Sequence, residues 1–126
     1  MKKVINTSSA PAPIGPYSQA IIAGGFVFVS GQIAINPSNG ELVTSDIKSE
    51  TKQVMENIKS ILIEADIDFG NIVKTSIFLK DMQHFAAVNE VYGTYFKDQF
   101  PARETIQVAG LPKNVNVEIS VTAVTP

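Results

Sequence analysis

The chain has 126 residues, a formal net charge of −2 and a pI of about 5.3, with no cysteine and a single histidine. This length suits one domain over residues 1–126, and the composition excludes disulfides, thiolate metal ligands, a cysteine nucleophile and any multi-histidine metal site. No apolar run is long enough for a membrane span or a signal peptide, and no basic cluster suggests nucleic acid. We therefore expect a cytoplasmic protein with small-molecule or protein partners.

The first third of the chain is predicted to form strands and turns. Residues 3–6 fit a short edge strand, and residues 7–16 are expected to be a loop because their three prolines disfavour regular structure. Residues 17–23 and 26–35 are predicted to be two strands joined by a glycine-glycine hairpin turn. An ordered loop as long as residues 7–16 is usually functional or held by a neighbour.

Two amphipathic helices are predicted in the middle of the chain, with a strand between them. Apolar residues recur at three- and four-residue steps from Asp46 to Ala65, which is the period of a helix with one buried face. Alternation over Ile72–Leu79 predicts a strand, and Asp81 is the expected cap of a second helix. The expected inward residues are Ile47, Thr51, Val54, Met55, Ile58, Ile61, Leu62 and Ala65 in the first helix, and Phe85, Val88, Tyr92 and Phe96 in the second.

Two further strands, separated by a turn near Gly110, are expected to end the chain. Pro101 stops the preceding helix, so Arg103 lies two residues into an extended segment. In residues 115–124 apolar and polar side chains alternate, and Glu118 is the only charge. If the two strands form a hairpin, Arg103 lies opposite Glu118 or close to it, and the two side chains converge on one patch of the sheet.

The predicted order is β, β, β, α, β, α, β, β, which indicates an α+β fold with a mixed sheet and two helices on one face. Nothing in the chain covers the other face of the sheet, yet several strands carry apolar side chains on both faces. The residues expected on the uncovered face include Phe26, Phe28, Ile72 and Phe78. Surplus apolar surface of this kind indicates a partner, and self-association is the commonest kind.

Arg103 and Glu118 are the strongest candidate pair for chemistry, and two interpretations stay open. They form either a structural cross-strand salt bridge or a site in which Arg103 binds a carboxylate while Glu118 holds a water. Tyr17, which follows Gly15 and Pro16, is either a packed aromatic side chain or a hydrogen-bond donor to a ligand.

The other polar candidates carry weaker signals. Ser30 lacks the flanking glycine pattern of a nucleophile elbow, and we expect Gly31 beside it to permit a close approach to the backbone. Asn89 fits an ordinary polar position of the second helix, and His84 is expected to be an exposed polar residue. No phosphate-binding loop or dinucleotide motif is present.

Several blocks, taken in one order, give the chain a family resemblance. They are Gly15-Pro16-Tyr17-Ser18-Gln19-Ala20, Val29-Ser30-Gly31-Gln32, Asn89 with Tyr92, Pro101-Ala102-Arg103, residues 108–112 and Val117-Glu118-Ile119. Over essentially its whole length the chain resembles the RidA (YjgF) family. The resemblance implies a chorismate-mutase-like fold, a homotrimer with three ligand clefts between subunits, and hydrolysis of 2-iminobutanoate and 2-iminopropanoate to 2-oxo acids and ammonia.

The same resemblance implies roles for individual residues. Arg103 would clamp the substrate carboxylate, Glu118 would orient the attacking water, and the backbone N–H of Thr105 would help to hold the ligand. Some members have cysteine where this chain has Thr105, but the implied contact is made by the backbone. The other substrate-binding residues that the resemblance implies are Tyr17, Ser30, Gly31 and Asn89, some of them from the neighbouring subunit.

No cofactor or metal is implied, because an iminium carbon is already electrophilic and a positioned water can attack it. Two other classes of function stay open. The chain could bind small carboxylates such as 2-oxo acids in a regulatory role, or it could act as an endoribonuclease or a chaperone, activities ascribed to parts of this family. The acidic pI argues against RNA as the partner.

Overall fold

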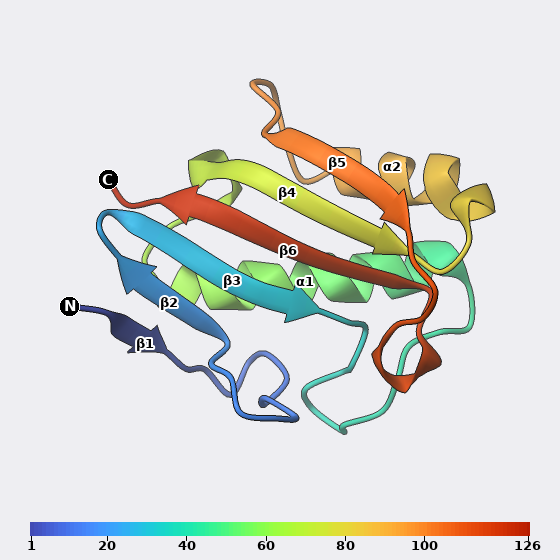
Figure 1. The fold of residues 1–126 in the computed structure, drawn as a ribbon, viewed down its shortest axis with the longest axis horizontal. Helices are drawn as coiled ribbons and strands as arrows, with labels where there is room; N and C mark the ends of the chain where they lie inside the picture. Colours follow the sequence, from blue (N-terminus) through green and yellow to red (C-terminus); the bar gives the residue numbers. More distant parts are fainter.

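The protein folds into a six-stranded sheet with two α-helices, and the computed structural model describes residues 1–126 (Figure 1). In space the strands are ordered β1-β2-β3-β6-β4-β5, and only β4 and β5 run parallel. The elements are β1 Lys3–Ile5, β2 Ala20–Ala23, β3 Phe26–Gln32, α1 Ile47–Glu64, β4 Ile72–Leu79, α2 Phe85–Gly93, β5 Ala102–Gln107 and β6 Val117–Val124.

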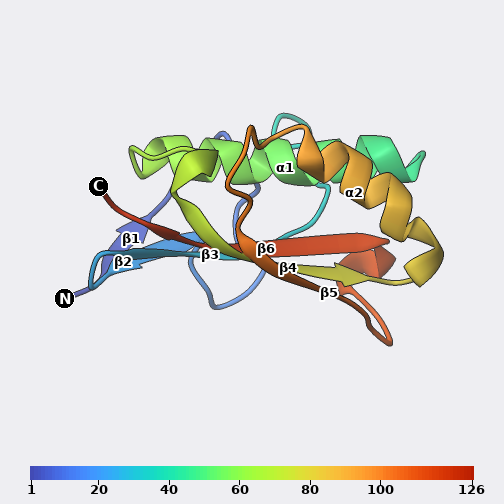
Figure 2. The same cartoon turned by 90° about the horizontal axis from the view of Figure 1, so that it is seen from above.

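Both helices lie on one face of the sheet, as the sequence predicts, and the other face is uncovered (Figure 2). Helix α1 begins after Asp46, whose side chain accepts a hydrogen bond from the backbone N of Ser49 at 2.8 Å. The middle of its apolar stripe, including Val54, Met55 and Ile58, is fully buried and forms the core with the inward side chains of the sheet. No helix of the structure combines the length and apolar character that a membrane crossing needs.

Most predicted elements are confirmed, with shifted ends. The second strand begins at Ala20 rather than at residue 17, and the third ends at Gln32 rather than at residue 35. The second helix begins at Phe85, after a short 3₁₀ turn over Met82–His84, and ends at Gly93. Phe96 therefore lies beyond the helix, although it still packs against the core.

The predicted hairpin between the last two strands is wrong. Strand β5 pairs with β4 in parallel, with Arg103 opposite Thr75, while β6 lies in the middle of the sheet between β3 and β4. The inward residues of β6 are all apolar and at most 4% exposed, so this strand gains most from a central position covered by helix. Strand β5 carries charged or polar side chains on both faces, Arg103, Thr105 and Gln107 on one and Glu104 on the other, which suits the edge.

The prediction that Ile72 lies on the uncovered face is also wrong. The β4–β6 register shifts between Ile72 and Lys74, so Val73 is left without a partner in the ladder. This irregularity turns Ile72 inward, where it pairs with Ala123 and is only 5% exposed.

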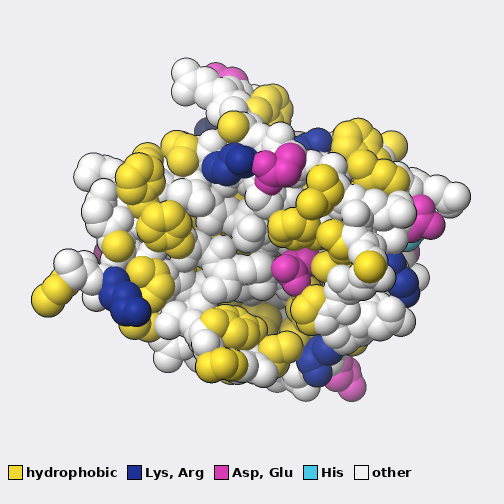
Figure 3. Space-filling view, in the orientation of Figure 1, with side chains coloured by type: hydrophobic (Ala, Val, Ile, Leu, Met, Phe, Trp, Pro, Cys, Tyr) yellow, Lys and Arg dark blue, Asp and Glu magenta, His cyan; other side chains and the backbone are white.

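The uncovered face mixes apolar and polar side chains. Phe26 and Phe28 are 43% and 47% exposed and their ring centroids lie 6.0 Å apart, which confirms the expected apolar surface on β3. On β5, Glu104 forms an ion pair with Lys74 at 2.9 Å and accepts a hydrogen bond from the Ser76 hydroxyl. Figure 3 looks onto this face and shows groups of apolar side chains around a polar centre.

The two faces of α1 provide a matched test of this packing. Ile58→Ala should lower the free energy of unfolding by about 2–5 kcal/mol, because it leaves a cavity between the helix and the sheet. Ile63→Ala, on the same helix but 61% exposed, should change it by less than about 0.5 kcal/mol. Urea unfolding at one fixed protein concentration measures both values, and equal losses would contradict the described orientation of α1.

Candidate functional site

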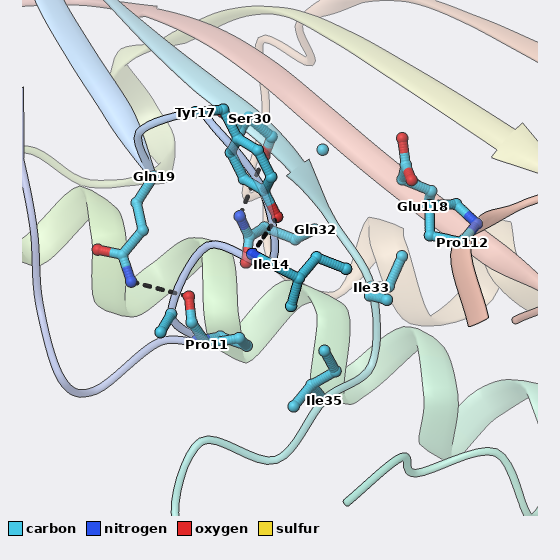
Figure 4. A pocket seen from close by; sticks show the side chains of 12 residues that line it. Pro11, Ile14, Tyr17, Gln19, Ser30, Gln32, Ile33, Ile35, Pro112 and Glu118 are labelled. Atoms are coloured by element: carbon cyan, nitrogen blue, oxygen red, sulfur yellow. Dashed lines mark hydrogen bonds between the residues drawn. The ribbon is translucent and has the colours of Figure 1, made fainter. Parts of the chain in front are cut away.

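A pocket of about 330 Å³ opens where β3 ends and β6 begins. Its walls come from the N-terminal loop around Pro11 and Ile14, from the segment Ser30 to Ile35, and from Pro112 and Glu118. Tyr17 lies on one side of the pocket and Glu118 on the other (Figure 4). Most of the wall is apolar, so the few polar groups define where a polar ligand could bind.

Glu118 is the acidic group of this pocket. It pairs with Phe78 in β4, which places its side chain on the uncovered face of the sheet, and the carboxylate has no hydrogen bond or ion pair within the chain. Burial raises the pKa of Glu118 above the usual range of a glutamate, because the ionised form is poorly solvated there. A half-buried carboxylate without a protein partner is available to a ligand or a water.

A β-bulge brings Gly31 against this carboxylate. Strand β3 pairs Val29 with Val121 and Gln32 with Ile119, so Ser30 and Gly31 together face a single residue of β6. A Cβ atom on Gly31 would lie 2.8 Å from the Glu118 Cδ, which is closer than real contacts allow. The expected close approach at Gly31 is therefore confirmed, and the approaching group is the side chain of Glu118.

Tyr17 and Ser30 both border the pocket, but their hydroxyl groups differ in whether the proton is used in a hydrogen bond within the chain. The Tyr17 hydroxyl accepts a hydrogen bond from the backbone N of Ile14 at 3.2 Å, so its own proton stays free for a ligand (Figure 4). The Ser30 hydroxyl donates to the Ser18 carbonyl at 2.6 Å. Ser30 therefore shapes the pocket wall, and its proton is already used within the chain.

Gln19 holds the N-terminal loop in place, a role that the sequence analysis missed. Its side chain is 2% exposed, its Oε1 accepts from the Thr7 N at 2.7 Å, and its Nε2 donates to the Thr7 and Pro11 carbonyls at 3.0 and 2.9 Å. The available signal was a lone glutamine next to a long proline-rich loop that needs hydrogen-bond partners. Gln19 thus fixes the first part of the loop, while the Tyr17 hydroxyl holds Ile14 near its end.

Arg103, the only arginine in the sequence, lies at the far edge of the sheet on the helix-covered face. Its guanidinium carbon lies 5.1 Å from the ring centroid of Tyr92 and 5.8 Å from that of Phe85. Tyr92 is itself fixed, because its hydroxyl donates to Thr75 Oγ1 at 2.9 Å, and burial raises its pKa. No carboxylate of the chain pairs with Arg103, so its hydrogen-bonding fork is free.

Thr105 and Asn89 lie near Arg103. Strand β5 is an edge strand, and the Val108 N donates to Leu79 of the neighbouring β4 at 2.9 Å. Since backbone groups alternate in direction along a strand, the N–H groups of Arg103 and Thr105 point to the free edge. Asn89 is one helical turn after Phe85, and so it lies on the side of α2 that contacts Arg103.

His84 departs from its expected exposure. The residue is partly buried, and its Nδ1 is enclosed without a hydrogen-bond partner, as is Oγ1 of Thr105. The chain contains no group of three or more His, Cys, Asp or Glu side chains that could hold a metal ion.

The prediction that Arg103 and Glu118 converge within one chain is wrong. Arg103 is aligned with Thr75 and points toward the helices, whereas Glu118 is aligned with Phe78 and points away from them. Strand β4 also separates the two residues laterally. One chain therefore carries two separate polar clusters, Arg103 with Thr105 and Asn89, and Glu118 with Tyr17, Ser30 and Gly31.

Comparison with known proteins gives this arrangement a family. The family model described as Endoribonuclease L-PSP matches residues 7–125. The chain belongs to this family, the RidA family. A RutC family protein of Pyrococcus horikoshii is 53% identical, and the mouse protein named 2-iminobutanoate/2-iminopropanoate deaminase is 48% identical. The matches cover 98% of this chain in both cases, and 98% and 92% of the two relatives.

Other RidA relatives carry different names, and some of them have solved structures. A Lactococcus lactis protein, 50% identical over 96% of both chains, is named as a candidate regulator, AldR. A Rid family structure from Yersinia pestis has a TM-score of 0.97 and 48% identity, covering 99% of this chain and 100% of its own. Escherichia coli TdcF, described with bound serine, has a TM-score of 0.94 and 40% identity, covering 98% of this chain and 99% of its own. The chain thus has the YjgF-like, chorismate-mutase-like fold that its sequence predicts.

The contact between Gly31 and Glu118 generates a prediction about titration. Gly31→Ala should displace the carboxylate toward solvent, and the pKa of Glu118 should fall toward its ordinary value because its burial is lost. Gly110→Ala is the matched control, since a Cβ there meets no atom within 4 Å. Carboxyl-carbon NMR titration, assigned with Glu118→Gln, measures the pKa, and an unchanged pKa in Gly31→Ala would contradict the described contact.

Proposed function

We propose that this RidA family protein hydrolyses reactive 2-imino acids, 2-iminobutanoate and 2-iminopropanoate, to 2-oxo acids and ammonia. The observation that carries the proposal is Glu118, a half-buried, unpaired carboxylate with a raised pKa beside an open pocket. Support comes from the mouse and human relatives named as deaminases for these two compounds, at 48% and 46% identity.

The proposed reaction needs one general base and no covalent intermediate. Water attacks C2 of the protonated imine while the Glu118 carboxylate accepts a proton from that water, and a carbinolamine forms. The amine nitrogen of this intermediate then receives a proton, the C–N bond breaks, ammonia leaves, and the hydroxyl group loses its proton to give the 2-oxo acid. A pKa raised toward the working pH makes Glu118 a more effective proton acceptor and donor in these steps.

A complete site requires a second copy of the chain. The side chains of Arg103 and Glu118 project from opposite faces of one sheet, and neither has a charged partner in its own chain. In a ring of identical subunits, one surface of each copy meets a different surface of the next, so Arg103 of one subunit can meet Glu118 of its neighbour. We propose a homotrimer with three such sites, in which the uncovered sheet faces meet and Phe26 and Phe28 are buried.

Each cluster then has a role in binding the imino acid. The Arg103 guanidinium binds the substrate carboxylate through two parallel hydrogen bonds, and the edge N–H of Thr105 and the amide of Asn89 add polar contacts. From the neighbouring subunit, Tyr17 donates its free hydroxyl proton to the ligand. Ser30 and Gly31 form the wall that brings the ligand beside Glu118.

Removal of the guanidinium should abolish the reaction without unfolding the protein. Arg103→Ala should lower kcat/KM by at least about a hundredfold, because the substrate loses its oriented carboxylate contact. Arg103→Lys should recover only part of this loss, since an ammonium cannot make the bidentate contact. A coupled assay in which an amino acid oxidase generates the imine measures the rate, and near-normal rates in Arg103→Ala would rule out the proposed role.

Mixing two inactive variants tests whether the site is shared between subunits. Arg103→Ala and Glu118→Gln should each be inactive alone, but random reassembly of equal amounts should restore about a quarter of wild-type activity. In about one quarter of the interfaces of such a ring, a subunit that retains Arg103 meets a neighbour that retains Glu118. The two proteins are unfolded together and refolded, with each variant refolded alone as the control. No recovery in verified mixed trimers would show that both groups act within one chain.

A second candidate function is non-catalytic binding of small carboxylates in a regulatory role. The Lactococcus lactis relative named as a candidate regulator and the TdcF structure described with bound serine favour this candidate. The two functions differ in turnover. If 2-iminobutanoate disappears no faster with the protein than in buffer, while 2-oxobutanoate still binds, the regulatory function replaces the deaminase.

The name of the matching family model raises endoribonuclease activity as a third candidate. The pI of about 5.3 and the single arginine offer little attraction for phosphates. RNA binding measured as a function of salt concentration decides this point, and binding that weakens steeply with salt would support it.

A further inference from the structure

Glu50 is a buried acidic residue that the proposed reaction does not use. It lies in the first turn of α1 and is 0% exposed, and no lysine, arginine or histidine pairs with it. Its Oε2 accepts hydrogen bonds from the backbone N of Asn116 at 2.7 Å and of Val117 at 3.1 Å, and its Oε1 accepts from Asn116 Nδ2 at 2.8 Å. A buried carboxylate is tolerated only with such partners, so these contacts are the reason it can be there.

The amides that Glu50 holds lie immediately before Glu118. Strand β3 last pairs with β6 at Gln32 and Ile119, so Val117 lies beyond the reach of the β3 ladder. The carboxylate of Glu50 supplies the acceptor that a neighbouring strand would otherwise provide. The first residues of β6 are therefore anchored to α1 at the point where the pocket opens.

The side chain of Glu118 has no anchor of its own. It forms no hydrogen bond within the chain, and its position is defined by its backbone and by its contact with Gly31. A small shift of the backbone at Val117 would therefore move the carboxylate directly. Displacements of about 1 Å in a reacting group can lower rates by about a hundredfold.

We propose that Glu50 is a positioning residue, which fixes the start of β6 so that the Glu118 carboxylate faces the bound substrate. The inference rests on the proposed function of Glu118 as the group that activates water. Glu50 touches neither the substrate nor the water, and it acts through the backbone of Asn116 and Val117.

Three substitutions of Glu50 distinguish the effect of its side-chain length from the effect of its negative charge. Glu50→Ala removes the acceptors, and Glu50→Asp keeps the charge but withdraws it from the amides by one methylene. Glu50→Gln keeps the length and an acceptor oxygen for both amides, provided that the Asn116 side-chain amide turns over. Thr51→Val is the matched control, because Thr51 is equally buried on α1 but its Oγ1 donates only to Ile47 of the same helix.

The expected result is a change in kcat with little change in KM. Below the unfolding temperature of each variant, Glu50→Asp and Glu50→Ala should lower kcat by about ten- to a hundredfold, while Glu50→Gln and Thr51→Val stay within about threefold of wild type. If Glu50→Ala does not fold, Glu50→Asp and Glu50→Gln still give the comparison. A kcat in Glu50→Asp equal to that of Thr51→Val would overturn the proposal.

A second readout does not depend on the deaminase activity. Hydrogen exchange should be slow at the Asn116 and Val117 amides in wild type and Glu50→Gln, and at least about tenfold faster in Glu50→Asp, while the rest of β6 stays protected. If the wild type does not hydrolyse imines but this exchange pattern holds, the proposed function fails and the anchoring of β6 stands. Unchanged exchange in Glu50→Asp overturns the positioning role whatever the activity.

Discussion

The central position of β6 is the constraint on which the structure depends. Its inward side chains, Val117, Ile119, Val121 and Ala123, are buried against the helices, and the strict alternation of a strand then turns Glu118 outward. A shift of one residue in register would expose the apolar set and bury the acid. The need to bury four apolar side chains therefore determines which face carries the acidic group of the pocket.

The same alternation places the basic and the acidic candidate residues on different faces of the sheet. Arg103 is held over two aromatic rings on the helix-covered face, and Glu118 stands against Gly31 on the uncovered face. Under the proposed function, a single chain can bind a carboxylate or hold a water but cannot do both at one place. Association then completes the chemistry as well as covering apolar surface, so the proposed activity depends on the assembled ring.

Local patterns in the sequence predict much of this fold, and long-range pairing limits the rest. The period of α1 and the alternation of β6 are local signals, and both elements are confirmed. The predicted hairpin of β5 and β6 is wrong because a turn near Gly110 is compatible both with a hairpin and with a connection that passes β4. Which of the two forms depends on which strand competes best for the central position of the sheet. The bulge at Ser30 and Gly31 and the anchoring by Glu50 depend on partners that lie up to about 90 residues away along the chain. Residue type and spacing single out Arg103, Glu118 and Tyr17 as candidates, whereas the role of the Thr105 backbone comes only from the family resemblance.

Gln19 has a consequence for how ligands enter and leave. Because one buried amide ties the backbone at Thr7, Ala10 and Pro11, the proline-rich segment that borders the pocket is already ordered before any guest arrives. A preformed wall loses little conformational entropy on binding, and no slow closure has to precede or follow it. Such an entrance favours rapid exchange of small ligands over long residence.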